Sequence, residues 1–232
     1  MKTIHDAHFH MSDPLLKYSL KGIVNASSPE EYNRLREYDY IVSAGIHPWY
    51  VDCTEYDAML PCLEKADMIG EIGLDNTWCS TDLTLQKNIF EKQLKLACKL
   101  HKPVILHLKG MEKEAYSYIC KYPNTYIVHW HSSKEMIQEY IDLGCYFTIG
   151  PSIEIDEAVN EVCRKCPLDK LLLESDGIEA IAWAYGCKEE DVSYLDALTK
   201  SIGAISKIKN MPFAEMEIQL DKNFYEIEKK TR

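Results

Sequence analysis

The chain has 232 residues, a length that fits one large domain better than two small ones. Its composition, 46% hydrophobic and 27% charged, is that of a globular protein and excludes the disordered, collagen-like and low-complexity classes. With 26 basic and 37 acidic residues the net charge is -11, which argues against a protein that coats nucleic acid through a general basic surface.

The sequence also predicts where the protein works. It lacks the roughly 18 consecutive apolar residues of a membrane helix, and its first residues lack the apolar core of a signal peptide. Nine scattered cysteines show no disulfide framework, so we expect reduced thiols, a cytoplasmic location, and neither a membrane nor an obligate protein partner. Cys163 and Cys166 could bind zinc, but a single C-x-x-C pair is more typical of structural thiols.

Eight short apolar or β-branched runs predict β-strands. They cover residues 3–9, 22–26, 41–46, 67–73, 103–108, 125–130, 145–149 and 170–175. Several of these runs have no polar face, as expected for parallel strands that helices cover on the outside.

The segments between these runs have helical patterns. Ser28, followed by Pro29 and Glu31, predicts a helix N-terminus, and the spacing of Ser132 and Glu135 predicts another. The longest helix is expected from about 84 to 101, with one apolar face. The segment between the first two strands is short, so its helix should shrink to a turn. This alternation predicts one domain over residues 1–232 with an α/β fold, a (β/α)8 TIM barrel.

Polar residues accumulate where these strands end, which is where such barrels carry their active sites. The two-residue period of a strand places Asp6, His8 and His10 on one side of the first strand. The later strand ends contribute His47, Glu71, Asp75, His107, His129, His131, Glu174 and Asp176. Six of the eight histidines therefore stand at or near a strand end.

This set of residue types predicts a metal site. Many buried imidazoles that converge with carboxylates need partners, and divalent cations are the usual ones. Because no cysteine is among the candidate ligands, the site suits zinc, manganese or magnesium. A carboxylate shared between two cations would make a dinuclear hydrolytic centre.

Seven motifs follow one another along nearly the whole chain. They are D-x-H-x-H at 6–10, G-I-H-P at 45–48, G-E-I-G-L-D at 70–75, the Q-x3-F-x2-Q-L run at 86–94, P-V-I-L-H at 103–107, L-L-L-E-S-D at 171–176 and the late Asn223-Phe224 pair, with His129 between the fifth and sixth. In this order they resemble the TatD-type metal-dependent hydrolases, a family of deoxyribonucleases with an amidohydrolase-like barrel.

The resemblance implies a ligand set with two divalent metal ions. One ion would be held by His8, His10 and Asp176, the other by His107 and His129, with Glu71 bridging the two. Glu71 and Asp176 would also be catalytic, with Asp176 orienting a metal-activated water or accepting its proton. Asp6 and Glu174 are expected to accept N–H groups of ligand imidazoles.

The resemblance is weaker at positions expected to face the substrate. Lys109 stands where the family usually has arginine, and Trp130-His131 replaces its usual C-F. We expect His47, Lys109, Trp130 and His131 to contact substrate, and His131 to be dispensable for metal because it lies beyond the strand end. The tryptophans at 49, 78, 130 and 183 follow strand ends, where they could either stack unpaired bases or pack loops over the barrel mouth.

These observations predict a metal-dependent hydrolase that cleaves phosphodiester bonds, as a 3′–5′ exonuclease would at the end of single-stranded DNA. One alternative is a hydrolase of a small ester, lactone or amide on the same barrel. A second is a barrel that keeps its metal for stability and serves as a binding scaffold. The complete ligand set, Asp176 included, argues against the scaffold.

Overall fold

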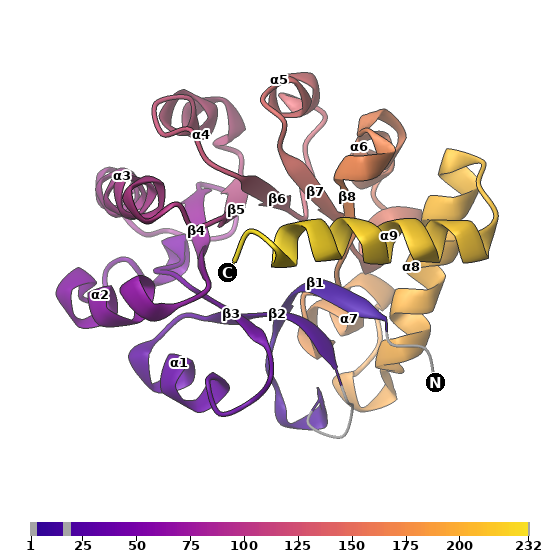
Figure 1. The fold of residues 1–232 in the computed structure, drawn as a ribbon, viewed down its shortest axis with the longest axis horizontal. Coiled ribbons are helices and arrows are strands. Elements are labelled where there is room, and N and C mark those ends of the chain that lie inside the picture. The colour runs from indigo at the N-terminus through magenta and orange to yellow at the C-terminus, as the bar shows by residue number, and fades with distance from the viewer. Residues whose placement is uncertain (1–3, 16–19, 232) are drawn as a thin grey trace.

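The computed structural model describes residues 4–15 and 20–231, and these form a nearly closed barrel of eight parallel strands with helices around it (Figure 1). The strands neighbour one another in chain order: β1 His5–His10, β2 Lys21–Ala26, β3 Ile41–Ala44, β4 Met68–Asp75, β5 Val104–Lys109, β6 Tyr126–His129, β7 Tyr146–Ile149 and β8 Leu171–Leu173. Each predicted run overlaps one strand, so the (β/α)8 prediction is confirmed.

The α-helices follow the strands along the chain. They are α1 Pro29–Leu35, α2 Tyr56–Lys65, α3 Leu83–Leu100, α4 Glu112–Ile119, α5 Ile137–Asp142, α6 Glu157–Lys165, α7 Ile178–Tyr185, α8 Tyr194–Lys209 and α9 Phe213–Glu228. Between β1 and β2 the described residues hold only the 3-10 turn η1, Asp13–Leu15, as predicted. None of the helices in the described part of the chain is long and apolar enough to cross a membrane.

The predicted helix starts have different outcomes. Ser28 does begin α1, because its Oγ accepts the Glu31 N–H at 3.1 Å. The start predicted at Ser132 is wrong, since α5 begins at Ile137. The preceding loop has other bonds: Ser133 Oγ accepts the Glu135 N–H, and the Glu135 carbonyl is bonded to a histidine side chain.

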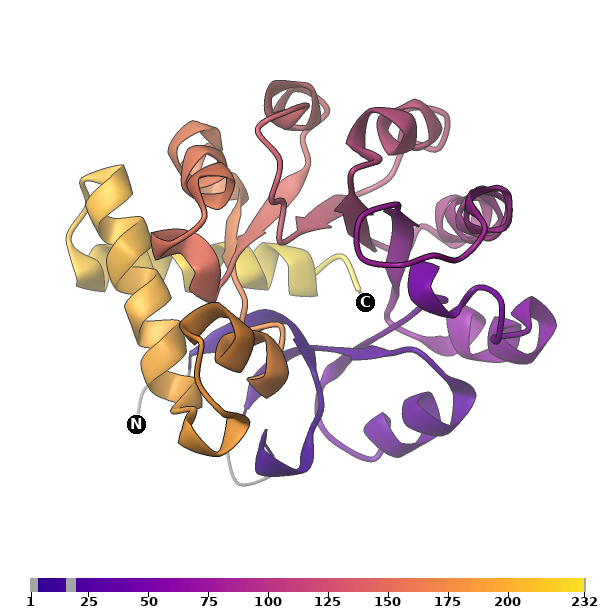
Figure 2. The ribbon, with the colours of Figure 1, turned by 180° about the vertical axis from the view of Figure 1, so that it is seen from behind.

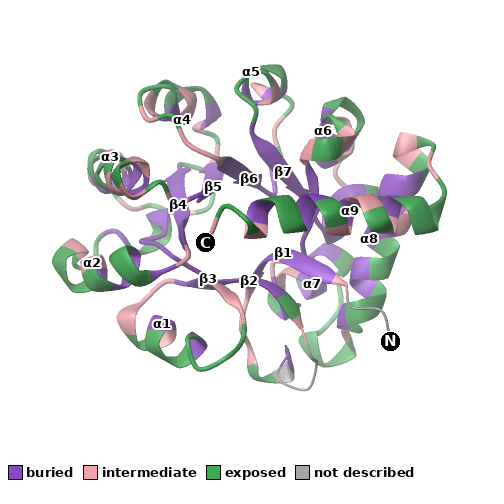
Figure 3. Cartoon of the chain, viewed as in Figure 1, coloured by how far each residue is buried: buried purple, intermediate pink, exposed green. Residues whose placement is uncertain are grey.

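Apolar side chains pack in two places: between the sheet and its helices, and inside the barrel near the N-terminal ends of the strands, here called its lower end. Figure 3 shows that the strands are largely buried, whereas the helices expose their outer faces. Helix α9 crosses that lower end, in front of the strands in Figure 1 and behind them in Figure 2. Phe224 and Ile227 of α9 join the inner cluster, and Asn223 Nδ2 donates to the carbonyl groups of Leu168 and Leu171. The barrel is therefore covered at the N-terminal ends of its strands.

Asp6 joins β1 to the segment after β8. Its carboxylate accepts the backbone N–H of Ser175 at 3.0 Å and hydroxyl groups of Ser175 and Tyr194 at 2.5 Å each. The β1–β2 register shifts between Asp6 and Phe9, which breaks the two-residue period. Asp6 therefore contacts His8 through the backbone N–H of His8, at 3.2 Å, while both ring nitrogens of His8 have no hydrogen-bond partner among the described residues. The prediction that Asp6 accepts an imidazole N–H is therefore wrong. Burial raises the pKa of Asp6 to about 7.

Two buried glutamines of α3 hold the backbone near the upper ends of β3 and β4. Gln86 accepts the Asp75 N–H and donates to the Asp75 carbonyl group, both at 2.9 Å. Gln93 accepts the Ile46 N–H at 2.7 Å and donates to the Ile46 carbonyl group at 3.1 Å. These pairs fix the chain next to His47 and at the end of the strand that carries Glu71.

The Gln93 pair generates a stability prediction. Gln93→Ala should lower the free energy of unfolding by about 2–4 kcal/mol, because it leaves the buried N–H and carbonyl group of Ile46 without partners. Urea denaturation would measure the loss. Gln138→Ala, which removes an exposed glutamine of α5, is the matched control and should change stability little. Equal losses in the two variants would contradict the prediction.

Candidate metal centre

The carboxylate of Glu71 lies at the centre of the barrel mouth. Glu71 belongs to β4, where the register with β5 shifts between Ile69 and Ile72, and its side chain is buried. Five imidazoles from four segments point at this one carboxylate. Their nearest nitrogens lie 3.4 Å (His8), 3.2 Å (His10), 3.4 Å (His47), 2.7 Å (His107) and 3.6 Å (His129) from a Glu71 oxygen.

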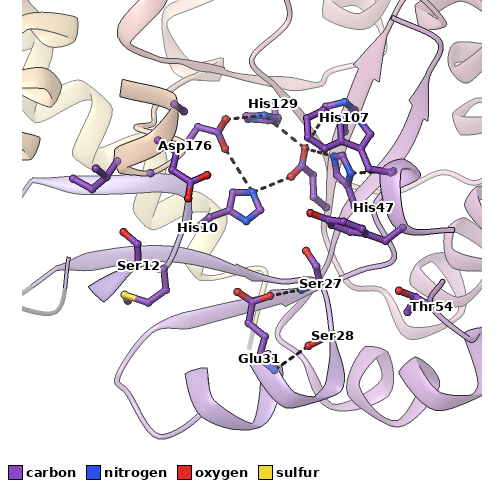
Figure 4. A pocket seen from close by; sticks show the side chains of 18 of the residues that line it. His10, Ser12, Ser27, Ser28, Glu31, His47, Thr54, His107, His129 and Asp176 are labelled. Atoms are coloured by element: carbon purple, nitrogen blue, oxygen red, sulfur yellow. Dashed lines mark hydrogen bonds and ion pairs between the residues drawn. The ribbon is translucent and has the colours of Figure 1, made fainter. Parts of the chain in front are cut away.

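Asp176 faces Glu71 from the loop after β8. Its Oδ1 lies 3.4 Å from His8 Nε2 and 3.6 Å from His10 Nε2, and its Oδ2 lies 3.8 Å from His129 Nε2. The turn that presents it needs a glycine, because Gly177 has φ 96° and a Cβ there would meet the His10 carbonyl oxygen at 3.0 Å. Figure 4 shows His10, His107, His129 and Asp176 converging on one pocket.

Two further carboxylates hold ligand imidazoles from outside. His129 Nδ1 donates to Glu174 at 2.7 Å, which leaves Nε2 facing the centre and confirms the role predicted for Glu174. Asp75 does the same for His107, whose Nε2 donates to Asp75 Oδ2 at 2.9 Å; Trp49 Nε1 donates to that oxygen at 2.7 Å. The sequence analysis placed Asp75 at a strand end but assigned it no role. Its position four residues after Glu71 on the same strand was the signal that could have indicated one.

The charges in this centre depend on one another. Burial alone would raise the pKa of Glu71, but the imidazoles of His47 and His129 and hydrogen bonds from His10 and His107 hold it well below its usual range. Burial also opposes ionisation of Asp176, yet the neighbouring histidines lower the pKa of Asp176 to about 2. Both carboxylates are therefore ionised at neutral pH.

The residues present suit a divalent cation. Both ring nitrogens of His8 are buried without a hydrogen-bond partner, although Nε2 faces two carboxylates. Three ligand groups have donor atoms within 4.8 Å of one another: His8, His10 and Asp176; His8, Glu71 and His129; and His47, Glu71 and His107. The first group is the one implied for one ion, whereas the third adds His47, which the sequence placed on the substrate side. Imidazole nitrogen and carboxylate oxygen are the donors that zinc and manganese accept.

The residues expected at the substrate side lie in different settings. His47 faces Glu71, and its Nδ1 accepts the Trp49 N–H. Lys109 donates to the carbonyl oxygen of Trp130 and to Ser132 Oγ, and burial lowers the pKa of Lys109. Trp130 itself is only 7% exposed.

His131 lies apart from the centre. Its ring packs against Tyr140 and Phe147, and its Nε2 donates to the Glu135 carbonyl group at 3.1 Å. Burial lowers the pKa of His131 to about 4. None of the candidate ligand groups formed by the described residues includes it.

Cys163 and Cys166 also lie apart from the centre. Both are fully buried, and burial raises the pKa of the Cys163 thiol to about 11. Neither cysteine belongs to a candidate ligand group among the described residues, which favours the structural interpretation of this pair.

Two adjoining grooves meet at the centre and share His107, His129, Asp176 and Trp49. The polar groove, with a volume of 570 Å³, contains Ser27, Ser28, Glu31, Thr54 and Glu179 (Figure 4). The aromatic groove, with a volume of 870 Å³, contains Lys109 and all four tryptophans, Trp49, Trp78, Trp130 and Trp183.

Comparison with known proteins places this centre in a family. The uncharacterised metal-dependent hydrolase YabD of Bacillus subtilis (strain 168) is 26% identical over 92% of this chain and 94% of its own length. The 3'-5' ssDNA/RNA exonuclease TatD of Citrobacter rodentium is 29% identical over 58% of this chain and 56% of its own length. The crystal structure of YjjV, a TatD homolog from Escherichia coli K12, has the same fold, with a TM-score of 0.82 over 97% of both chains at 24% identity. A family model described as TatD related DNase matches residues 17–229. Since that match spans most of the sequence, the chain belongs to the TatD-related DNase family of metal-dependent hydrolases.

Proposed function

We propose that the protein removes nucleotides from the 3′ end of single-stranded DNA by metal-dependent hydrolysis of phosphodiester bonds. The observation that carries this proposal is the convergence of five imidazoles and the Asp176 carboxylate on buried Glu71. The name of the Citrobacter rodentium relative, a 3'-5' ssDNA/RNA exonuclease, supports the substrate and the polarity.

The ligand geometry supports two ions. His8, His10 and Asp176 would hold one ion, and His107 and His129 the other, with Glu71 between them because its two oxygens face different imidazoles. His47 has the same access to Glu71 as these ligands, so it would serve either the second ion or the substrate phosphate. Zinc, manganese and magnesium remain the candidate ions.

The protein side chains divide the chemistry among them. Bound divalent cations would supply Lewis acidity, which polarises phosphoryl oxygens and lowers the pKa of water. Asp176 is ionised, and its side chain is 20% exposed, so it can hold the attacking water and accept its proton. Glu174 and Asp75 keep His129 and His107 in the orientation that turns one ring nitrogen toward Glu71.

The charge of the mouth favours a strand end over a long duplex. Among the described residues that line the two grooves, Lys109 is the single lysine or arginine. Outside the metal centre, the grooves also have five carboxylates: Glu31, Glu112, Glu135, Asp156 and Glu179. The two grooves therefore do not form a long basic surface for duplex DNA.

Nine free cysteine thiols suit the reducing cytoplasm, where we place the protein.

The roles of Glu71 and Asp176 generate a paired prediction. Glu71→Ala should remove or scramble bound metal, because Glu71 contacts the ligands of both proposed ions. Asp176→Asn should keep much of the metal but lower kcat by about 10²-fold or more, since the amide cannot accept a proton. Elemental analysis and steady-state kinetics would test both, with Glu71→Gln as an isosteric variant should the alanine variant misfold. Equal metal loss in the Glu71 and Asp176 variants would contradict this division.

Two neighbouring histidines allow a test of the ligand set. His129→Ala should lose metal, whereas His131→Ala should keep its full metal content. The second variant should instead lose about 1–3 kcal/mol of stability, because it removes a buried ring that packs against Tyr140 and Phe147. Metal analysis and urea denaturation would show both effects. Loss of an ion in His131→Ala would mean that the site has recruited an additional imidazole.

The sparse positive charge predicts a weak dependence on salt. Binding through about one to three phosphate contacts should give a slope of log(kcat/KM) against log[salt] of about -0.7 to -2 for single strands. End-labelled single- and double-stranded oligonucleotides would be digested over a salt series. We expect exonucleolytic products and a preference for single strands, so a steep slope with duplex preference would reject the model. A metal-loaded enzyme that hydrolyses a small ester or phosphodiester but no oligonucleotide would refute the proposed substrate.

A further inference from the structure

Three of the four tryptophans of the aromatic groove are exposed to solvent instead of packing loops together. Trp78 and Trp183 are 62% and 63% exposed, and Trp49 is 42% exposed, although indole is a large apolar group. Single exposed apolar residues are common on protein surfaces, but several along one groove mark a binding surface. The groove shares His107, His129 and Asp176 with the metal centre, so its ligand is connected to the reaction.

The rings of Trp183, Trp130 and Trp49 are held in place before any ligand binds. Trp183 of α7 lies edge to face with Trp130, with the ring centroids 6.0 Å apart, and Trp130 is itself buried. Trp49 is fixed by its N–H bond to Asp75, which also holds His107. Rigid aromatic rings that expose a face or edge suit stacking on unpaired bases, which requires no particular sequence.

The two grooves differ in what they can accept. In the polar groove, Ser27, Ser28 and Thr54 offer hydroxyl groups to a single nucleotide. The aromatic groove also has carboxylates, Glu112, Glu135 and Asp156, beside Lys109, so charge does not separate the two grooves. It is larger, however, and it has the exposed indole rings on which several successive bases could stack. The strand should therefore run along the aromatic side.

We propose that the aromatic groove stacks the bases of the nucleotides that stay in the strand, while the polar groove receives the nucleotide that is released. This assignment rests on the proposed exonuclease function. It makes Trp183 and Trp78 the main stacking residues, with Trp130 packed edge to face against Trp183.

Position-specific abasic substrates would test the assignment. Oligodeoxythymidylates would lack a base either at the terminal nucleotide or at the second and third nucleotides from the digested end, with every phosphate retained. On the complete strand, Trp183→Ala should raise KM about 5- to 150-fold with a smaller change in kcat, and Trp183→Phe should recover most of the loss. The Trp183→Ala penalty should persist with the terminal abasic site and vanish with the internal ones. Tyr38→Ala, which removes an exposed aromatic residue that lines neither groove, is the control and should behave as wild type.

Binding would be measured separately from catalysis, by anisotropy of labelled oligonucleotides on the Asp176→Asn protein with and without Trp183→Ala. The stacking assignment predicts the same 5- to 150-fold loss of affinity there. A penalty that vanishes only with the terminal abasic site would give the groove to the released nucleotide and overturn the proposal. If the tryptophan variants digest single strands as fast as the wild type, the stacking assignment alone is refuted. If the wild-type enzyme digests no oligonucleotide, the proposed function is refuted together with the assignment.

Discussion

The arrangement of the site depends on a buried negative charge at the barrel mouth. Glu71 is 2% exposed, and an ionised carboxylate there is tolerated only because imidazoles surround it. Those imidazoles need fixed orientations, which Glu174 and Asp75 provide by accepting their outer N–H groups. The backbone that carries them is held in turn by Gln86 and Gln93 from α3. Helix α3 thus fixes the strand ends, and the strand ends fix the ligand side chains of the centre.

Much of this could be predicted from the sequence because it depends on regular patterns. Apolar runs of strand length, separated by helical periodicity, define the barrel, and the barrel brings all strand ends together. Histidines and carboxylates at those ends therefore had to meet, which is why His8, His10, His107 and His129 could be named before the structure. The motif order then identified the family, and the family model confirms it.

The remainder depends on irregularities that a periodic pattern does not contain. A register shift in β1 directs the Asp6 carboxylate to Ser175 and Tyr194, although the two-residue period predicted that the side chains of Asp6 and His8 would share one face. His131 shares that period with His129, but it lies beyond the strand end and turns into the core. The exposure of the tryptophans could not be predicted from the sequence either, because it depends on how loops from distant strands fold over one another.

The two hydrogen bonds of His107 affect how the protein would bind its metal. His107 is clamped between Glu71 and Asp75, and although burial opposes it, the hydrogen bonds to Asp75 and Glu71 raise the pKa of this histidine. A proton on Nδ1 can therefore hold the ring in place until a cation replaces it. Metal binding would then exchange protons for the cation among side chains that are already in position. Acidity would compete directly with the cation, and the apoprotein would keep the shape of its own active site.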